Sequence, residues 1–236
     1  MRRCLVVLAL ATAEAALGAS FSVSPVRVEL SPRDNVVAVT VTNTGDQPGS
    51  IRLSVFSWRQ EANEDRLDPT RELVATPPLF TVAPGESQIV RFGLRRAPKA
   101  DRELSYRAIF EEIPGPRPAQ GAPALQITLR ISIPIFYQSR EDMKSTLVWT
   151  LARDGADKLR LSVRNDGAAS AQLGDLGLAR PGVAAPFVQQ KNFAYVLPGA
   201  ERSWSLSIPA AEMTSSQVRI LTTVDGKRGE VEVGVE

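Results

Sequence analysis

The sequence predicts an all-β protein made of two tandem immunoglobulin-like β-sandwich domains. Short stretches in which apolar and polar residues alternate, the period of a half-buried strand, follow one another along the chain. Clusters of Gly, Pro, Asn and Asp separate them, and no convincing amphipathic helix interrupts them. Short strands at this spacing are typical of two-sheet sandwiches, and 236 residues that are 43% hydrophobic can form the core of one or two domains.

The first 19 residues have the layout of a secretory signal peptide. Two arginines precede an apolar run from Leu5 to Ala11, and small residues follow at positions 18 and 19. The run is short and Glu14 follows it closely, which does not suit a membrane-spanning helix; a buried helix is the alternative. We therefore expect residues 1–19 to be a signal peptide, cleaved within 18–20, and the remaining chain to be exported without stable membrane insertion.

The N-terminal sandwich is predicted to cover residues 20–137. Its first strand contains Pro25, which indicates an edge strand or a kink. The polar stretch 59–70 is predicted to be a loop, and a Pro- and Gly-rich run at 114–123 leads into the last strand. The expected strands lie within residues 21–30, 35–43, 50–58, 76–94, 104–114 and 123–137.

A polar segment at 138–145 is predicted to link this domain to a smaller C-terminal β-sandwich at 146–236. The strands expected there lie within residues 146–153, 157–167, 170–178, 192–208 and 217–235.

Two segments of the second domain resemble segments of the first. "VRNDG" at 163–167 matches "VTNTG" at 41–45, and "VLPGAERSWSL" at 196–206 matches "VAPGESQIVRF" at 82–92. The pairs indicate two related sandwiches, although turn chemistry alone also produces such matches.

The chemistry of common enzymes is missing from the sequence. Histidine is absent and the only cysteine is Cys4, which removes Ser-His-Asp and Cys-His arrangements and the usual zinc ligands. The acidic residues within 61–65 are predicted to be solvated, and Glu111 and Glu112 point to opposite faces of one strand. With a net charge of +2 and no basic block, nucleic acid is not an expected partner. We expect no enzyme activity, no cofactor and no metal.

An apolar stripe and three arginines are the features that call for a function. The stripe, a set of apolar residues at alternate positions from 125 to 133, either belongs to a core strand after a long turn or contacts another molecule outside the chain. Arg27, Arg107 and Arg130 lie in separate predicted strands; each is an exposed strand residue, or they converge to bind a carboxylate. The stripe occupies alternate positions, Leu125, Ile127, Leu129, Ile131 and Ile133.

Three blocks of the first domain resemble the periplasmic pilus chaperones of the bacterial chaperone–usher pathway. They are "TPPLFTVAPGESQIVRF" at 76–92, "RELSYRAIFEEIP" at 102–114 and "LQITLRISIPIFY" at 125–137, and the last two look most like the archaic branch. The resemblance implies a boomerang of two domains in the periplasm that captures pilus subunits. It lends them a donor strand and then delivers them to an outer-membrane usher. The donor residues carried over are Leu125, Ile127, Leu129 and Ile131.

The resemblance also implies a basic anchor for the subunit's C-terminal carboxylate in the cleft between the domains. Arg27 matches the first-strand arginine of the family. The better-known branch carries a lysine late in the donor strand where this chain has Pro134. We expect Arg107 to replace it, with Arg130 as the second choice.

Two rival functions are a secreted β-sandwich adhesin or carbohydrate-binding module, and a hydrolase on the same scaffold. A sugar-binding module favours exposed aromatic residues, whereas Trp58, Trp149 and Trp204 are predicted to be core or sheet-face residues. An exposed apolar strand is also an aggregation hazard. We therefore expect the free protein to cover its stripe, by self-association or with residues 114–123 lying over it.

Overall fold

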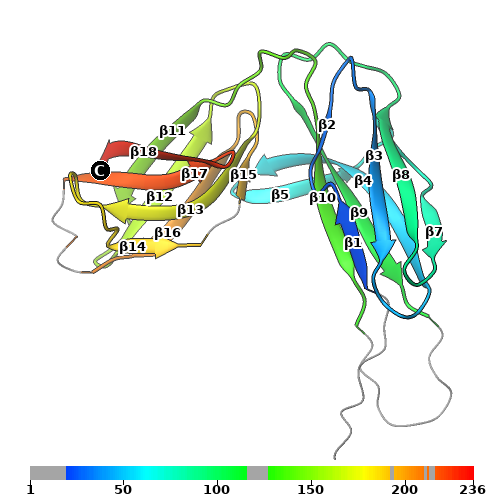
Figure 1. Ribbon diagram of the computed structural model, residues 1–236. Coiled ribbons are helices and arrows are strands. Elements are labelled where there is room, and N and C mark those ends of the chain that lie inside the picture. The colour runs from blue at the N-terminus through cyan, green and yellow to red at the C-terminus, as the bar shows by residue number, and fades with distance from the viewer. Residues whose placement is uncertain (1–19, 116–126, 192–193, 210–211, 213–215) are drawn as a thin grey trace, which may run out of the picture.

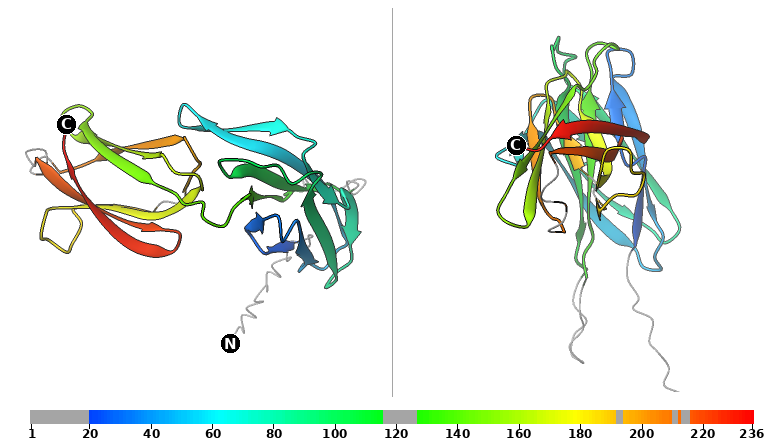
Figure 2. Two further views of the ribbon diagram at one scale, coloured as in Figure 1. Left: turned by 90° about the horizontal axis from the view of Figure 1, so that it is seen from above. Right: turned by 90° about the vertical axis from the view of Figure 1, so that its left-hand side faces the viewer.

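The computed structural model describes residues 20–115, 127–191, 194–209, 212 and 216–236. The predicted signal peptide, Leu125 and most of the predicted 114–123 loop lie outside these residues. Two β-sandwiches meet at an angle, as in a boomerang, which Figure 1 shows from the side and Figure 2 from two further directions. No helix among the described residues combines the length and apolar character needed to cross a membrane.

The N-terminal sandwich packs a four-stranded sheet on a six-stranded sheet. Odd-numbered residues of β3 such as Val39 and Val41 are fully buried between the sheets while their neighbours are not, as the alternation predicts. The first sheet has the order β1 (Phe21–Ser24), β3 (Val36–Asn43), β8 (Ser87–Leu94) and β6 (Leu73–Thr76). The second has the order β2 (Val28–Leu30), β10 (Arg130–Tyr137), β9 (Leu104–Ile113), β4 (Gly49–Glu61) and β5 (Glu64–Pro69), with β7 (Leu79–Val82) also paired to β4.

Pro25 was predicted to mark an edge strand or a kink, and the strand is interrupted there: β1 and β2 on either side of it are edge strands of two different sheets. β1 pairs with β3 in one sheet, and β2 pairs in parallel with β10 in the other. Arg27 therefore lies at the crossing between the sheets, directly before β2.

The prediction of a loop at 59–70 is wrong. β4 continues to Glu61 and turns through Ala62 and Asn63, both at positive φ, into β5, which ends at Pro69. Every residue of β5 is exposed, so this strand has no buried face and its sequence shows no apolar alternation.

The C-terminal sandwich is smaller and is built in the same way. One sheet has the order β11 (Leu147–Arg153), β12 (Lys158–Asn165) and β16 (Glu201–Ser207). The other has the order β14 (Val188–Gln190), β13 (Ala171–Ala179), β17 (Gln217–Val224) and β18 (Lys227–Gly234), with β15 (Ala194–Val196) also paired to β13. Residues 138–146 connect β10 to β11.

The matching sequence segments make the same hydrogen bonds in both domains. The side-chain amide of Asn43 donates to Val82 O at 3.0 Å, and that of Asn165 donates to Val196 O at 2.9 Å. Gly85 N donates to Asn43 O and Gly199 N donates to Asn165 O. Both asparagines are fully buried, and each connects the end of its own strand to the turn in the second matching segment of its domain. This shared pattern supports the prediction of two related sandwiches.

Candidate functional site

β10 has an open edge beside its first residues. It pairs with β9 along its whole length but with β2 only over Ile135–Tyr137. Within the described part of the chain, no strand pairs with the outer side of residues 130–134. An open strand edge is a template for another chain.

The main-chain groups at this edge can be assigned from the ladder. Glu112 N donates to Leu129 O on the β9 side, and Gln138 N donates to Leu30 O on the β2 side. Because successive residues of a strand point their main-chain groups to opposite sides, Arg130 and Ser132 direct theirs to the open edge. Pro134 has the same parity and has no N–H to offer there.

The apolar stripe changes gradually from core to surface. Ile133 is 2% exposed and belongs to the core cluster of the N-terminal sandwich. Leu129 and Ile131 are partly buried against that cluster, whereas Ile127 is 78% exposed. The late positions of the stripe therefore fill this domain's core, and the early described positions are increasingly uncovered.

Arg27 and Arg107 converge on the ring of Tyr195 from the second domain. The Arg27 guanidinium carbon lies 5.7 Å from the Tyr195 ring centroid, and that of Arg107 lies 5.8 Å from it. Arg27 also lies 4.8 Å from the Phe136 ring, and Arg107 stacks 3.8 Å above Trp58. Aromatic faces hold guanidinium groups by cation–π attraction while leaving their N–H groups free to bind an anion.

The charges around the two arginines are unevenly balanced. Arg27 donates to Glu29 at 3.0 Å and lies 3.9 Å from Asp225 of the second domain, with its side chain 26% exposed. Burial lowers the pKa of Arg107, and the carboxylate of Asp65 opposes that shift. An arginine remains charged through such a shift, so Arg107 is a partly buried cation at the domain junction, whereas Arg27 is paired with Glu29 and Asp225.

Arg130 does not join this cluster. Its guanidinium pairs with Glu111 of the neighbouring strand at 3.1 Å, with its side chain 64% exposed. It lies four residues before Pro134, which is about 13 Å along a strand. Arg107, by contrast, is the direct cross-strand neighbour of Pro134, so it stands beside the position at which the resemblance leads us to expect a basic residue.

The aromatic cluster at the domain junction was not predicted from the sequence. Trp58, Phe136 and Tyr195 form a buried cluster with Leu197 and Ala200 that joins the two domains. The Trp58 and Tyr195 rings meet edge to face with their centroids 5.6 Å apart. One available signal is the parity of Phe136, which alternates with the core residues Ile135 and Tyr137 and so had to face outward.

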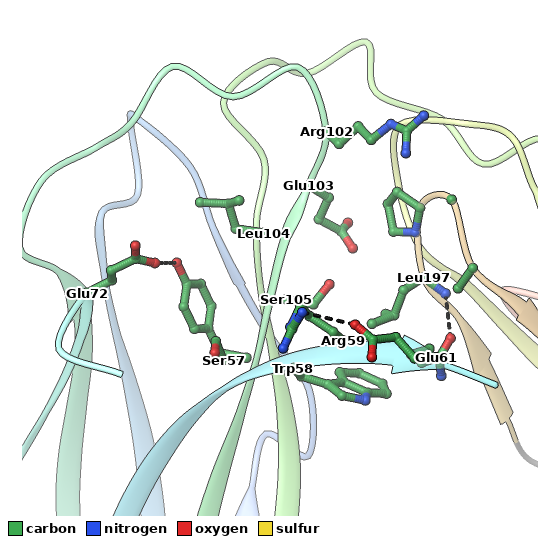
Figure 3. Close-up of a pocket in the computed structure, with 15 residues that line it drawn as sticks. Ser57, Trp58, Arg59, Glu61, Glu72, Arg102, Glu103, Leu104, Ser105 and Leu197 are labelled. Atoms are coloured by element: carbon green, nitrogen blue, oxygen red, sulfur yellow. Dashed lines mark hydrogen bonds and ion pairs between the residues drawn. The ribbon is translucent and has the colours of Figure 1, made fainter. Parts of the chain in front are cut away.

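A cavity of about 410 Å³ lies at the domain junction, and its lining includes neither Arg27 nor Arg107. Figure 3 shows it between the loop that carries Arg102 and Glu103, the strand that carries Trp58 and the segment around Leu197. Glu103 is 5% exposed, and burial raises the pKa of its carboxyl group. Gln138 Nε2 and Ser170 N both donate to this carboxylate, at 2.8 and 3.1 Å, so it ties the linker and the second domain together.

No group of three His, Cys, Asp or Glu residues in the described ranges is placed to hold a metal ion. The described geometry is that of a two-domain immunoglobulin-like protein with an open strand edge that leads to a basic and aromatic cluster at the domain junction.

Comparison with known families and structures places the chain more narrowly. The family model for the N-terminal domain of pili and flagellar-assembly chaperones of the PapD type matches residues 20–141. The chain belongs to this chaperone family.

A curated relative, the chaperone protein FimB/FhaD of Bordetella pertussis, is 28% identical over 137 residues. That match covers 56% of this chain and 55% of the relative, so the chain spans about half the length of the curated relative it matches.

Solved structures with the same fold cover nearly the whole chain. The CsuC–CsuE complex, a chaperone with a tip subunit from archaic chaperone–usher Csu pili of Acinetobacter baumannii, gives a TM-score of 0.69 at 20% identity. That alignment covers 92% of this chain and 99% of the other. The Salmonella enterica SafA pilin in complex with the SafB chaperone gives a TM-score of 0.62 at 16% identity, covering 92% and 95% of the two chains. The YadV chaperone gives a TM-score of 0.60 at 19% identity, covering 90% and 98%.

Proposed function

We propose that this protein is a periplasmic chaperone that binds pilus subunits by lending them β10 and the residues before it, and that it delivers them to an outer-membrane usher. The observation that carries the proposal is the open edge of β10, which ends at the two converging arginines. Family membership and the fold shared with an archaic-pathway chaperone support it, and we place the protein in that branch.

The charges predict the direction in which a partner strand binds. β2 covers the edge of β10 from Ile135 onward, so a partner strand added ahead of β2 ends beside Arg27. Two guanidinium groups attract a terminal carboxylate and repel a terminal ammonium. The subunit's C-terminus therefore belongs at this end, and its last strand runs parallel to β10.

The stripe and the anchor make different contributions to binding. Burying one isoleucine or leucine side chain contributes about 1.5–3 kcal/mol, so several donor residues outweigh one anchor. A hydrogen bond to a charged carboxylate contributes about 1.5–3 kcal/mol. The anchor also fixes the register, and a slip of one residue would turn every donor side chain to the wrong face.

The remaining assignments follow from this one. Residues 1–19 act as the export signal, and residues 138–145 join a donor domain at 20–137 to a second sandwich at 146–236. The protein acts as a chaperone rather than an enzyme. A sugar-binding module is the weaker alternative, because the exposed large apolar side chains of the described residues include no aromatic ring.

Co-expression with secreted proteins encoded beside this one, followed by a pull-down, tests the proposal. We expect a one-to-one complex with a small subunit that lacks a strand. Arg27→Ala and Arg107→Ala should each weaken it by about 10- to 100-fold, because each removes a charged hydrogen-bond donor from the anchor.

Arg130→Ala is the matched control. Arg130 is also an arginine and lies on the same face of the sheet as Arg107, but its guanidinium pairs with Glu111 and not with the aromatic cluster. Its complex should survive. Capture of a glycan but of no subunit, or equal loss for all three variants, would reject the proposal.

A further inference from the structure

The β4–β5 hairpin of the first domain lies against two strand edges of the second. Figure 1 shows the turn between β4 and β5 extending toward β15, and Figure 2 shows the same hairpin reaching the second domain in the view from above. Strands β15 and β16 are the edges of the two C-terminal sheets: β15 pairs only with β13, and β16 only with β12, among the described strands.

Gln60 makes the contacts with the β15 edge. Its Nε2 donates to Tyr195 O at 2.9 Å, and its Oε1 accepts from Leu197 N at 3.0 Å. In a parallel ladder, one residue of a neighbouring strand would bind the same two groups, a carbonyl and the N–H two residues later, with its own N–H and C=O. The side-chain amide of Gln60 therefore takes the place of that residue.

Asn63 makes the corresponding contacts with the β16 edge. Its Nδ2 donates to Ser203 O at 3.0 Å, and its Oδ1 accepts from Ser203 N at 2.9 Å. A hydrogen-bonded antiparallel residue pair makes the same two hydrogen bonds, and here a side-chain amide makes them. Arg202 Nη1 donates to Asn63 O at 2.7 Å and holds the turn itself.

Asp65 orients both contacts from the returning strand. Its Oδ1 accepts from Gln60 Nε2 at 3.0 Å and lies 3.6 Å from Arg202 Nη1. The positive φ of Ala62 and Asn63 lets the chain reverse within two residues, which keeps Gln60 and Asn63 at fixed spacing on the hairpin tip.

We infer that this hairpin is an interdomain clamp in which the Gln60 and Asn63 amides substitute for a neighbouring strand and so position Tyr195 against Arg27 and Arg107. Gln60 binds the main chain of the residue whose ring contacts both guanidinium groups. The clamp itself depends only on these contacts. Its effect on carboxylate binding rests on the proposed function.

The test converts both amides to isosteric acids. Gln60→Glu and Asn63→Asp keep the shape but face a carbonyl with a carboxylate, so each loses its donor and gains a repulsion. Gln190→Glu, at an exposed position of β14, is the matched control for added charge.

Spin labels read the interdomain geometry. They are placed on Arg91→Cys in β8 and Lys227→Cys in β18, both exposed, in a full chain that also carries Cys4→Ser. The parent and Gln190→Glu should give one narrow distance distribution, and the double variant Gln60→Glu/Asn63→Asp a broad one. An unchanged narrow distribution in the double variant would overturn the clamp.

Peptide binding measures how well Arg27 and Arg107 are positioned to bind a carboxylate. The probe is a short synthetic peptide of alternating valine and threonine, with either a free or an amidated C-terminus. The preference for the free carboxylate should fall at least fivefold in the double variant and stay at the parent's value in Gln190→Glu. Broad distances with an unchanged preference would overturn the positioning role. A parent with no preference would instead reject the carboxylate anchor, while the distances still decide the clamp.

Discussion

Replacing Ile127 and Ile133 separately by alanine should divide the stripe into its two roles. Both residues occupy alternate positions of the same sequence stripe, yet Ile127 is 78% exposed and Ile133 is 2% exposed. Each change removes three carbon atoms, worth about 0.8 kcal/mol apiece when buried. Because roughly four fifths of Ile127 is uncovered, a partner that buries it loses about 2 kcal/mol with Ile127→Ala, or about 30-fold in Kd.

The same arithmetic predicts a different loss for Ile133→Ala. This side chain is already buried inside the domain, so its truncation should lower the free energy of unfolding by about 2–5 kcal/mol, including the cavity that is left. Urea unfolding followed by tryptophan fluorescence measures the stability of both variants. Titration with a purified subunit measures their affinity.

Ile127→Ala should unfold at the same urea concentration as the parent and bind the subunit more weakly, whereas Ile133→Ala should unfold at a lower urea concentration. An Ile127→Ala protein with unchanged stability and unchanged affinity would refute the donor role of this position. An Ile127→Ala protein that lost stability as Ile133→Ala does would show that the side chain belongs to the domain's own core.

Two further predictions concern stability. Because burial raises the pKa of Glu103, the folded state binds the proton of this carboxyl group more tightly than the unfolded state does. The free energy of unfolding should therefore fall as pH rises from about 4.3 through the raised pKa, and then level off. Urea titrations at several pH values should show this slope in the parent and lose it in Glu103→Gln. Asn165→Ala should lower the free energy of unfolding by at least about 2 kcal/mol, because it leaves the buried carbonyls of Ala169 and Val196 without their donor. Asn35→Ala, at an exposed position, should leave the free energy of unfolding unchanged. Thermal or urea unfolding of both variants measures the difference.

The sandwich fold follows from local pattern because a sheet with one buried face shows that face in its sequence. Val39 and Val41 alternate with less buried residues, and the asparagines of the two matching turns mark the ends of equivalent strands. The β4–β5 hairpin was missed for the same reason. Its strand β5 buries nothing, so it has no pattern to read, and its contacts lie more than a hundred residues away in the sequence.

The candidate site was only partly predictable because its groups come from different sheets and domains. Strand parity places Arg107 and Arg130 on one face of the sheet and does not say which of them meets Arg27. Tyr195, which contacts both Arg27 and Arg107, comes from β15 in the other domain. Nothing in the local sequence around Tyr195 indicates that contact.

The boundary between buried and exposed positions in the stripe also depends on tertiary structure. Alternation continues unbroken through the stripe, but β9 ends at Ile113, and continuing its register with β10 places Ile113 opposite residue 128. Residues before that point have no β9 residue across from them, which explains why Ile127 is exposed while Leu129 still packs on the core. Under the proposed function, the groove of a subunit that lacks one strand covers Ile127 with strands of its own.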